Sequence, residues 1–255
     1  MAREALLLKV AIVTGSSSGI GAAAALELAR RGWKLVVNYS KSASQAEKIA
    51  SQCGDAIAVK ADVSEDADCR ALAKRALDQW GRIDALVNNA GATKFVPHAR
   101  LEELSAEDFV RIYRVNVVGA FQMTRACAPA LKQSRGAVVN VSSVAALLGT
   151  GSSIAYAASK AAVNTLTFSL ARVLGPEVRV NAVCPGFTDT PWMIEGHGAE
   201  RYAELSKRYA AAAPLGSTCV PEDIAEAIAW LVEGARKVTG ETIFVDAGIH
   251  IASPR

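Results

Sequence analysis

Short, almost uninterrupted apolar runs recur along the chain, and segments with helical periodicity separate them. Runs of this kind, without the alternation of a half-exposed strand, are typical of strands buried on both faces of a parallel sheet. The expected strands are Lys9–Thr14, Lys34–Tyr39, Ala56–Ala61, Ala85–Asn88, Ala137–Val141, Val178–Val183 and Thr242–Val245. The expected helices are Gly19–Arg31, Ala43–Gln52, Glu65–Trp80, Ala106–Gln133, Ile154–Leu174 and Pro221–Glu233. This alternation predicts an α/β fold, a doubly wound, seven-stranded parallel sheet with helices on both faces.

The chain of 255 residues is expected to form one domain over residues 1–255, because no linker, repeat or low-complexity segment divides it. One region, about 187–220, breaks the alternation of strands and helices before the last strand. Long irregular segments inside compact domains are commonly functional. We therefore expect an irregular substrate loop in this region, with residues 191–214 acting as a mobile lid.

Composition excludes several classes of function. The chain is 51% hydrophobic and 21% charged, which predicts a substantial core and excludes an intrinsically disordered protein. The net charge of +3 is dispersed and includes no run of basic residues, so no nucleic acid is expected as a partner. No apolar stretch is long enough to span a membrane and no signal peptide is evident, so we expect a cytoplasmic protein without membrane association.

The cysteines and histidines predict no metal site. Five cysteines form no C-x-x-C pair, and the three histidines lie far apart in the sequence. An odd number of cysteines in a chain without a secretion signal indicates reduced thiols.

The first expected strand leads into a glycine-rich turn, Thr14–Gly21, that precedes the first helix. Glycines let the backbone turn sharply and approach a ligand closely, and a helix N-terminus offers free N–H groups to a pyrophosphate. The sequence therefore predicts a nucleotide site here, with a tight turn that binds no ligand as the alternative. The candidate cofactor-binding residues of the turn are Gly15, Ser17, Ser18, Gly19, Ile20 and Gly21.

Tyr156 and Lys160 are four residues apart in the expected helix Ile154–Leu174, so they lie on one face of it. A positive charge about 4 Å from a phenol lowers its pKa from the ordinary value of about 10 toward the range useful for catalysis. Ser142 and Ser143 end the preceding strand, at the sheet edge where ligands bind in such folds. These residues predict acid–base chemistry on a substrate oxygen; a surface tyrosine beside a solvated lysine is the alternative.

These features are part of a set of motifs that covers nearly the whole chain. The further motifs are Asp62-Val63, Asn88-Asn89-Ala90-Gly91, Asn116, Pro185-Gly186-Phe187-Thr188-Asp189-Thr190 and Val245-Asp246. Ser143 precedes Tyr156 by thirteen residues. With the glycine turn and the tyrosine–lysine pair, this set resembles the short-chain dehydrogenase/reductase family in its single-domain form. The resemblance implies a Rossmann-like fold, a nicotinamide cofactor and hydride transfer between an alcohol and a carbonyl.

The resemblance also implies roles for individual residues. Tyr156 would be the general acid in reduction and the base in oxidation, and Lys160 would lower its pKa and contact the nicotinamide ribose. Ser143 would bind the substrate oxygen, and Asn116 would hold a water of a proton relay; an ordinary buried asparagine is the alternative for Asn116. The other implied cofactor contacts are Asp62, Val63, Asn89, Ala90, Gly91, Pro185, Gly186 and Thr188.

The end of the second strand bears on the choice of cofactor. NAD-dependent enzymes of this kind carry an acid there to bind the ribose hydroxyls, and an acid would repel a 2′-phosphate. Tyr39, Ser40 and Lys41 stand at this place instead, which favours NADP(H). Ser18 stands where many NADP-dependent relatives have arginine, so NAD(H) is kept as the alternative.

The last third of the chain predicts an apolar, partly aromatic substrate wall that suits a ketone with a hydrocarbon body. The residues expected in it are Phe95, Val96, Leu147, Leu148, Phe187, Trp192 and Met193. The chain looks most like 3-oxoacyl-carrier-protein reductases and related ketone reductases. The alternatives are an NAD-dependent alcohol, sugar or steroid dehydrogenase and a nucleotide-binding sensor without turnover.

An acyl-carrier protein would need basic side chains beside the entrance. Lys132, Arg135 and Arg172 are candidates, but Ser134 and Glu177 stand where carrier-protein reductases have such bases, which argues against this partner. Ala247 replaces a glycine that is common in the family near the end of the chain.

Assembly is predicted from the two long helices. The expected helices Ala106–Gln133 and Ile154–Leu174 carry more apolar surface than one sheet face needs. Such helices pair across a two-fold axis in the family, which predicts a homotetramer or homodimer.

Overall fold

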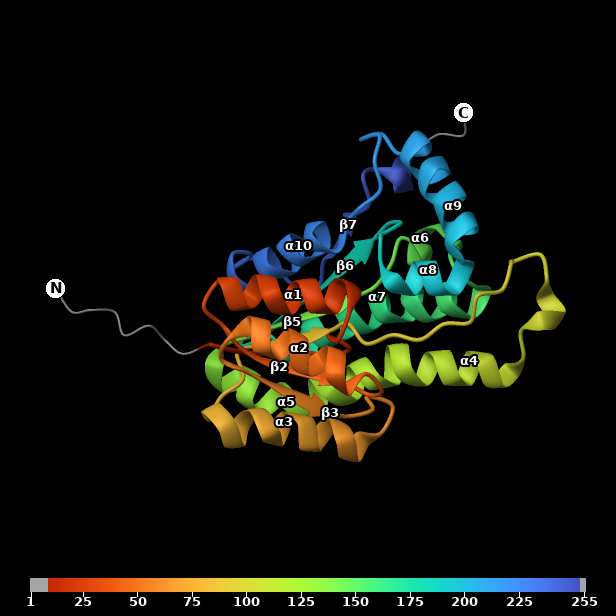
Figure 1. The fold of residues 1–255 in the computed structure, drawn as a ribbon. Helices are drawn as coiled ribbons and strands as arrows, with labels where there is room; N and C mark the ends of the chain where they lie inside the picture. The colour runs from red at the N-terminus through yellow and green to blue at the C-terminus, as the bar shows by residue number, and fades with distance from the viewer. Residues whose placement is uncertain (1–8, 253–255) are drawn as a thin grey trace.

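Seven strands pair in parallel, in the order β3-β2-β1-β4-β5-β6-β7, in the computed structural model, which describes residues 9–252 (Figure 1). The strands are β1 (Val10–Val13), β2 (Lys34–Tyr39), β3 (Ala56–Lys60), β4 (Ala85–Asn88), β5 (Ala137–Val141), β6 (Arg179–Pro185) and β7 (Thr242–Val245). The strand order reverses between β1 and β4, and ligands bind outside the carboxyl ends of the strands at such a reversal. The predicted Rossmann-like sheet is confirmed, and no strand boundary differs from its expected place by more than two residues.

Helices cover both faces of the sheet (Figure 1). On one face, α1 (Gly19–Arg30), α2 (Ala43–Cys53) and α10 (Pro221–Glu233) bury side chains such as Leu28, Ala46 and Ile228 against the strands. On the other face, α3 (Asp66–Trp80), α5 (Ala120–Ser134) and α7 (Ile154–Leu174) bury Leu72, Met123 and Leu170. The inner strands between these layers are buried on both sides, which explains their almost uninterrupted apolar sequences, whereas the edge strands β3 and β7 are partly buried.

Residues 106–134 are helical throughout, as predicted for Ala106–Gln133, but they do not form a single α-helix. The structure divides this segment into α4 (Ala106–Tyr113), the π-helix η2 (Arg114–Gly119) and α5. The Ser105 hydroxyl caps α4 by accepting a hydrogen bond of 3.3 Å from the Asp108 N–H. A π-helix widens the turn by one residue and is frequent at functional sites.

The prediction of an irregular region at 187–220 is wrong. It contains α8 (Pro191–His197) and α9 (Ala199–Ala212), which project above the carboxyl edge of the sheet (Figure 1). Gly198, with φ of +77°, turns the chain between the two helices. The short helices α6 (Ala145–Leu148), η1 (Leu101–Glu103) and η3 (Ile249–Ile251) were not predicted either.

Other features bear on the remaining expectations. Over residues 9–252, no helix is both long enough and apolar enough to cross a membrane. Within the same range, no cluster of three His, Cys, Asp or Glu side chains could hold a metal ion. Ala247 has a φ of +55°, a value that favours the glycine common at this place in relatives. The single domain over 1–255 stays a prediction, because residues 1–8 and 253–255 lie outside the described residues.

Candidate active site

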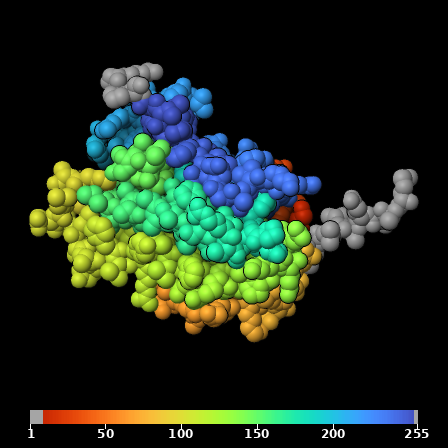
Figure 2. All heavy atoms as spheres, turned by 180° about the vertical axis from the view of Figure 1, so that it is seen from behind, coloured from red at the N-terminus to blue at the C-terminus, as the bar shows by residue number. Residues whose placement is uncertain are grey.

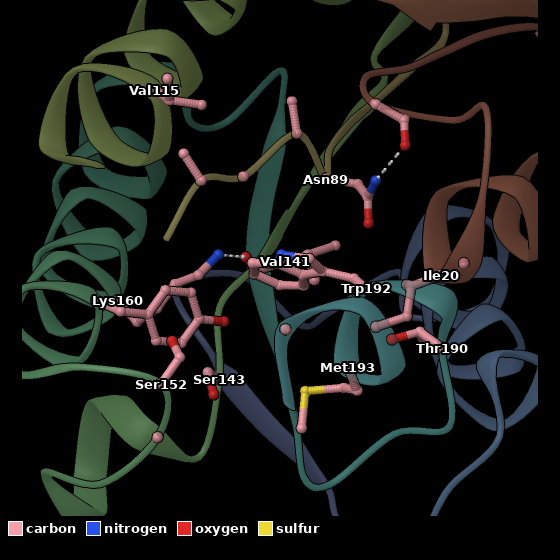
Figure 3. A pocket seen from close by; sticks show the side chains of 18 of the residues that line it. Ile20, Asn89, Val115, Val141, Ser143, Ser152, Lys160, Thr190, Trp192 and Met193 are labelled. Carbon is pink, nitrogen blue, oxygen red and sulfur yellow. Dashed lines mark hydrogen bonds between the residues drawn. The ribbon is translucent and has the colours of Figure 1, made fainter. Parts of the chain in front are cut away.

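A cavity of about 1470 Å³ lies at the carboxyl edge of the sheet, where the strand order reverses (Figure 3). Nearly every residue that the sequence predicts for the site lines it. These residues are Gly15, Ser17, Ser18, Gly19, Ile20, Tyr39, Ser40, Lys41, Asp62, Val63, Asn89, Ala90, Gly91, Ser143, Tyr156, Lys160, Pro185, Gly186 and Thr188. The two others, Gly21 and Asn116, are buried next to this lining. Segments far apart in sequence therefore meet in one place.

The glycine turn forms a cradle made of backbone. Gly15 and Gly19 have φ of +60° and +55°, which glycine adopts without strain. A Cβ at Gly21 would overlap the Gly15 carbonyl and the Asn89 amide. Asn89 Nδ2 donates hydrogen bonds of 2.9 Å to the carbonyl oxygens of Thr14 and Gly15, and so holds the turn from the neighbouring strand. The narrow backbone surface at the start of α1 fits the pyrophosphate of a dinucleotide.

Asn38 supports the same turn, although the sequence motifs did not single it out. Its Oδ1 accepts a hydrogen bond of 3.1 Å from the Gly15 N–H, and its Nδ2 donates one of 3.0 Å to the Ala61 carbonyl. Its backbone N–H donates to Ser16 Oγ at 3.0 Å. Asn38 is 1% exposed and ties the glycine turn to β2 and β3. An amide inside an apolar strand was the signal for this role, because buried amides need partners.

The far end of the cavity is polar. Tyr39, Ser40 and Lys41 line it after β2, and the side chains of Ser40 and Lys41 are exposed. Asp62 lines it after β3, and its Oδ1 accepts a hydrogen bond of 2.9 Å from the Ser64 N–H. These groups could hold the adenosine end of a dinucleotide.

Helix α7 presents the tyrosine and the lysine to the cavity. Ser153 caps it, because its Oγ accepts a hydrogen bond of 3.2 Å from the Tyr156 N–H. Tyr156 is 9% exposed and Lys160 only 4%. Lys160 Nζ donates a hydrogen bond of 2.7 Å to the Val141 carbonyl at the end of β5 and lies 5.5 Å from the centroid of the Tyr156 ring (Figure 3). The predicted juxtaposition of the two side chains is present.

The electrostatic consequence differs from the expectation. Burial raises the pKa of Tyr156 to about 12, and the Ser143 hydroxyl acts in the opposite direction with a smaller effect. Burial lowers the pKa of Lys160 to about 8. The expected net lowering of the pKa of Tyr156 is therefore not met in this structure, because the loss of solvation of the phenol outweighs the other effects. At neutral pH Tyr156 carries its proton, as a general acid must.

Asn116 reaches helix α7 from the π-helix η2. Its Oδ1 accepts a hydrogen bond of 2.7 Å from the Ala92 N–H, and its Nδ2 donates one of 3.0 Å to the Ala92 carbonyl. The same Nδ2 donates to Ser159 Oγ at 2.9 Å, and Ser159 Oγ donates to the Tyr156 carbonyl at 2.7 Å. Ser159 is 1% exposed and connects Asn116 to the turn that carries Tyr156. The sequence motifs did not single out Ser159.

The two serines after β5 have different surroundings. Ser142 is buried, and its Oγ donates a hydrogen bond of 3.1 Å to the Lys160 carbonyl, which fixes α7 against the strand end. Both serines line the cavity, but Ser143 is less buried, and its Oγ accepts a hydrogen bond of 3.1 Å from the Ala145 N–H. The Ser142 hydroxyl donates its proton to the Lys160 carbonyl, whereas no such donated bond occupies the Ser143 hydroxyl among the described residues.

The expected substrate wall is only partly correct. Phe95, Val96, Phe187, Trp192 and Met193 line the cavity. Leu147 and Leu148 do not line it and are 58% and 41% exposed, because the single turn of α6 directs them to the surface. The basic residues Lys132, Arg135 and Arg172 are exposed and none of them lines the cavity.

A backbone cradle for a dinucleotide that opens onto an acid–base side chain defines a nucleotide-dependent oxidoreductase. Comparisons with known proteins agree. A family model described as enoyl-(acyl carrier protein) reductase matches residues 15–250. The chain therefore belongs to the short-chain dehydrogenase/reductase family, and it is an NAD(P)-dependent oxidoreductase.

Individual relatives are similar over almost their whole length. A protein of Streptomyces violaceoruber named granaticin polyketide synthase putative ketoacyl reductase 2 is 45% identical over 98% of this chain and 100% of its own. A 3-oxoacyl-[acyl-carrier-protein] reductase of Synechocystis is 38% identical over 96% and 98%. The crystal structure of a putative short-chain dehydrogenase/reductase from Burkholderia xenovorans, 41% identical, has a TM-score of 0.89 over 96% of this chain and 99% of that chain.

Proposed function

We propose that this protein is an NADPH-dependent ketone reductase with Tyr156, Lys160, Ser143 and Asn116 as its catalytic residues. The observation that carries this proposal is the position of Tyr156 and Ser143 on the wall of the same cavity that contains the glycine cradle. A bound nicotinamide supplies hydride to the carbonyl carbon in reduction and accepts it from the alcohol in oxidation.

Protein side chains supply the proton that the carbonyl oxygen receives during reduction. The Tyr156 hydroxyl donates its proton to the carbonyl oxygen as negative charge develops there, and the Ser143 hydroxyl donates a hydrogen bond to the same oxygen. Lys160 keeps a positive charge 5.5 Å from the phenol ring, which stabilises the phenolate left after proton transfer. Asn116 and Ser159 hold the backbone of α7, and with it Tyr156, in place.

NADP(H) is the proposed cofactor. The cradle would hold the pyrophosphate, Lys160 would contact the nicotinamide ribose, and Ser40 and Lys41 would contact the 2′-phosphate. Support comes from the exposed Lys41 ammonium and Ser40 hydroxyl at the adenosine end, where residues 39–41 include no acid. A phosphate gains charge-assisted hydrogen bonds from such groups.

The substrate is proposed to be a ketone with an apolar body, the class that includes 3-oxoacyl groups. The names of the Streptomyces and Synechocystis relatives support this class. The apolar lining from Val96, Phe187 and Met193 supports it as well. An acyl-carrier protein stays a doubtful partner, because the basic candidates Lys132 and Arg172 do not line the cavity.

We also propose that copies of the chain associate through α4, α5 and α7, which lie side by side on the face shown in Figure 2. Large apolar side chains are exposed on these helices, including Phe109, Tyr113, Phe121 and Phe168 at 37–46%. Exposed aromatic side chains in such number mark an association surface. A homotetramer or homodimer is therefore proposed.

The cytoplasmic location stays a prediction. The five cysteines are free and buried.

The experiment that tests this function is a steady-state assay of the purified protein. NADPH consumption is followed with ketones and 3-oxoacyl thioesters, and NADP⁺ reduction is followed with the corresponding alcohols. Turnover of ketones that depends on Tyr156 supports the proposal. Absence of turnover with all of these substrates and with both cofactors contradicts it.

A further inference from the structure

The catalytic tyrosine has an aromatic neighbour on helix α8. The rings of Tyr156 and Trp192 meet edge to face, with centroids 6.0 Å apart and planes at 69°. Figure 3 shows Trp192 extending from α8 toward the strand end at Val141. Trp192 is 41% exposed and lines the cavity, so part of its ring remains open to a ligand.

Helix α8 is held in this position by contacts with the segment after β4. Phe95 packs edge-on against Trp192 at a centroid distance of 6.1 Å and against His197 at 4.7 Å. Gly196 lies against the Phe95 ring so closely that a Cβ there would overlap it. The indole is therefore fixed by its surroundings and does not depend on a substrate for its placement.

A second group of rings lines the same cavity. Phe187 stacks on Tyr209 with centroids 4.8 Å apart and planes at 26°, and on Tyr202 at 5.8 Å. Phe187 and Tyr209 line the cavity, as does the flexible thioether of Met193. A ligand held at Tyr156 thus lies in a cavity that presents aromatic surface from two separate groups.

We propose that Trp192 is a specificity-determining residue that selects ketones whose carbonyl is part of, or attached to, a ring system that contains a flat aromatic ring. This inference rests on the proposed function, because it assumes that a ketone oxygen binds at Tyr156 and Ser143. Aromatic rings gain from offset-stacked or edge-to-face contacts beyond the area they bury. A rigid ring also loses less conformational freedom on binding than an open alkyl chain does.

The experiment compares 2-tetralone, a fused-ring ketone, with 2-decanone, an open-chain ketone of the same carbon number. The kcat/KM of each is measured with NADPH, and the ratio of the two values is the readout. For the wild type we expect a clear preference for 2-tetralone. Trp192→Leu should lower the ratio about threefold to tenfold, while Trp192→Phe, which keeps a ring, should retain most of it.

Matched variants separate a change in substrate specificity from a general loss of activity or stability. Trp230 is an exposed tryptophan on α10 that does not line the cavity, so Trp230→Leu should leave the ratio unchanged. Gly196→Ala keeps the indole but displaces α8 from Phe95, and it should lower the ratio as Trp192→Leu does. This second route tests the inference even if Trp192→Leu proves unstable.

The outcomes distinguish this inference from the proposed function. A wild-type ratio near one, or a ratio that Trp192→Leu leaves unchanged, overturns the inference and leaves ketone reduction intact. Reduction of a 3-oxoacyl thioester without reduction of 2-tetralone also overturns it. Failure to reduce 2-tetralone, 2-decanone and a 3-oxoacyl thioester alike contradicts the proposed function, and the inference falls with it.

Discussion

Asn116 Nδ2 donates a hydrogen bond of 2.9 Å to Ser159 Oγ, and both side chains are almost fully buried. Ser159 Oγ in turn donates to the Tyr156 carbonyl. The contact joins the π-helix to the turn that carries the proposed general acid. Because Ser159 is buried and has two good partners at this place, we expect it to position Tyr156.

This role predicts the behaviour of Ser159→Ala. We expect kcat for ketone reduction to fall by about tenfold, since small displacements of a catalytic group are costly. The KM for NADPH should change little, because Ser159 does not line the cavity. Ser169, an exposed serine on the same helix, provides the control, and Ser169→Ala should behave as the wild type. Equal loss of kcat and of thermal stability at both positions would contradict a positioning role.

Tyr156→Phe tests the acid directly. The variant keeps the ring packed against Trp192 but removes the proton donor. Turnover should fall by at least about 10²-fold, while NADPH affinity measured by fluorescence titration should change little. Because burial raises the pKa of Tyr156 to about 12, the free hydroxyl should stay protonated below pH 8, and the rate of reduction should show no loss from its titration in that range. A Tyr156→Phe variant with most of its turnover would remove the tyrosine from the mechanism.

Lys160→Met should separate activity from stability. Burial lowers the pKa of Lys160 to about 8 from an ordinary value of 10.5, so the folded protein binds this proton less tightly than the unfolded chain does. The charged Lys160 therefore lowers the free energy of unfolding by its full amount below pH 8, and this loss shrinks as pH rises from 8 to 10.5. After allowing for the lost hydrogen bond to Val141, we expect Lys160→Met to gain about 2 kcal/mol at pH 7 and to lose its activity.

Thermal unfolding measures this gain. A gain of that size raises the Tm at pH 7 by about 4–8 °C in a chain of this length. The gain should shrink toward pH 10.5. Lys132→Met replaces an exposed lysine on α5 and should show neither effect. A Tm difference that grows with pH would show that the sign of the argument is wrong.

The choice of cofactor is tested by titration with NADPH and NADH. We expect NADPH to bind at least about tenfold more tightly, because Lys41 and Ser40 can contact the 2′-phosphate. Tyr39→Asp should reverse or abolish the preference by repelling that phosphate. Gln52→Asp makes the same change of charge at an exposed position of α2, outside the cavity lining, and serves as the control. Tighter binding of NADH by the wild type would refute the proposed cofactor.

The state of association is tested by light scattering at micromolar concentration. The wild type should have the mass of a dimer or tetramer. Phe121→Glu together with Phe168→Glu places charges on exposed apolar positions of α5 and α7 and should shift the protein toward monomers. The corresponding change at Trp230, Trp230→Glu, should not. A wild-type monomer would contradict the assembly.

The sheet and the main site residues could be predicted because their signals are local. Buried parallel strands leave apolar runs, and an i, i+4 pair such as Tyr156 and Lys160 shares a helix face wherever that helix packs. The π-helix around Asn116 could not be predicted, because inserting one residue into a turn leaves the apolar pattern nearly unchanged. The roles of Asn38 and Ser159 depend on partners from distant segments, which periodicity does not reveal.

Helices α8 and α9 could have been predicted, because the sequence carries signals for their ends. Pro191 stands at the first turn of α8, and Gly198 and Pro214 flank α9, which are ordinary helix boundaries. The orientation of Leu147 and Leu148 had no such signal, because a single helical turn does not define a buried face. The pKa of Tyr156 depends on how completely the fold excludes water from the phenol, and spacing alone does not give that quantity.

The hydrogen bonds of Asn38 have a consequence for how such enzymes diversify. Asn38 holds the glycine turn from within the sheet, and the side chains proposed to meet the adenosine ribose begin only one residue later, at Tyr39. Substitutions at residues 39–41 can therefore accumulate without loosening the turn. Proteins of this family can therefore change their preference between NADPH and NADH through a few neighbouring substitutions, while the residues at Tyr156 and Ser143 stay the same.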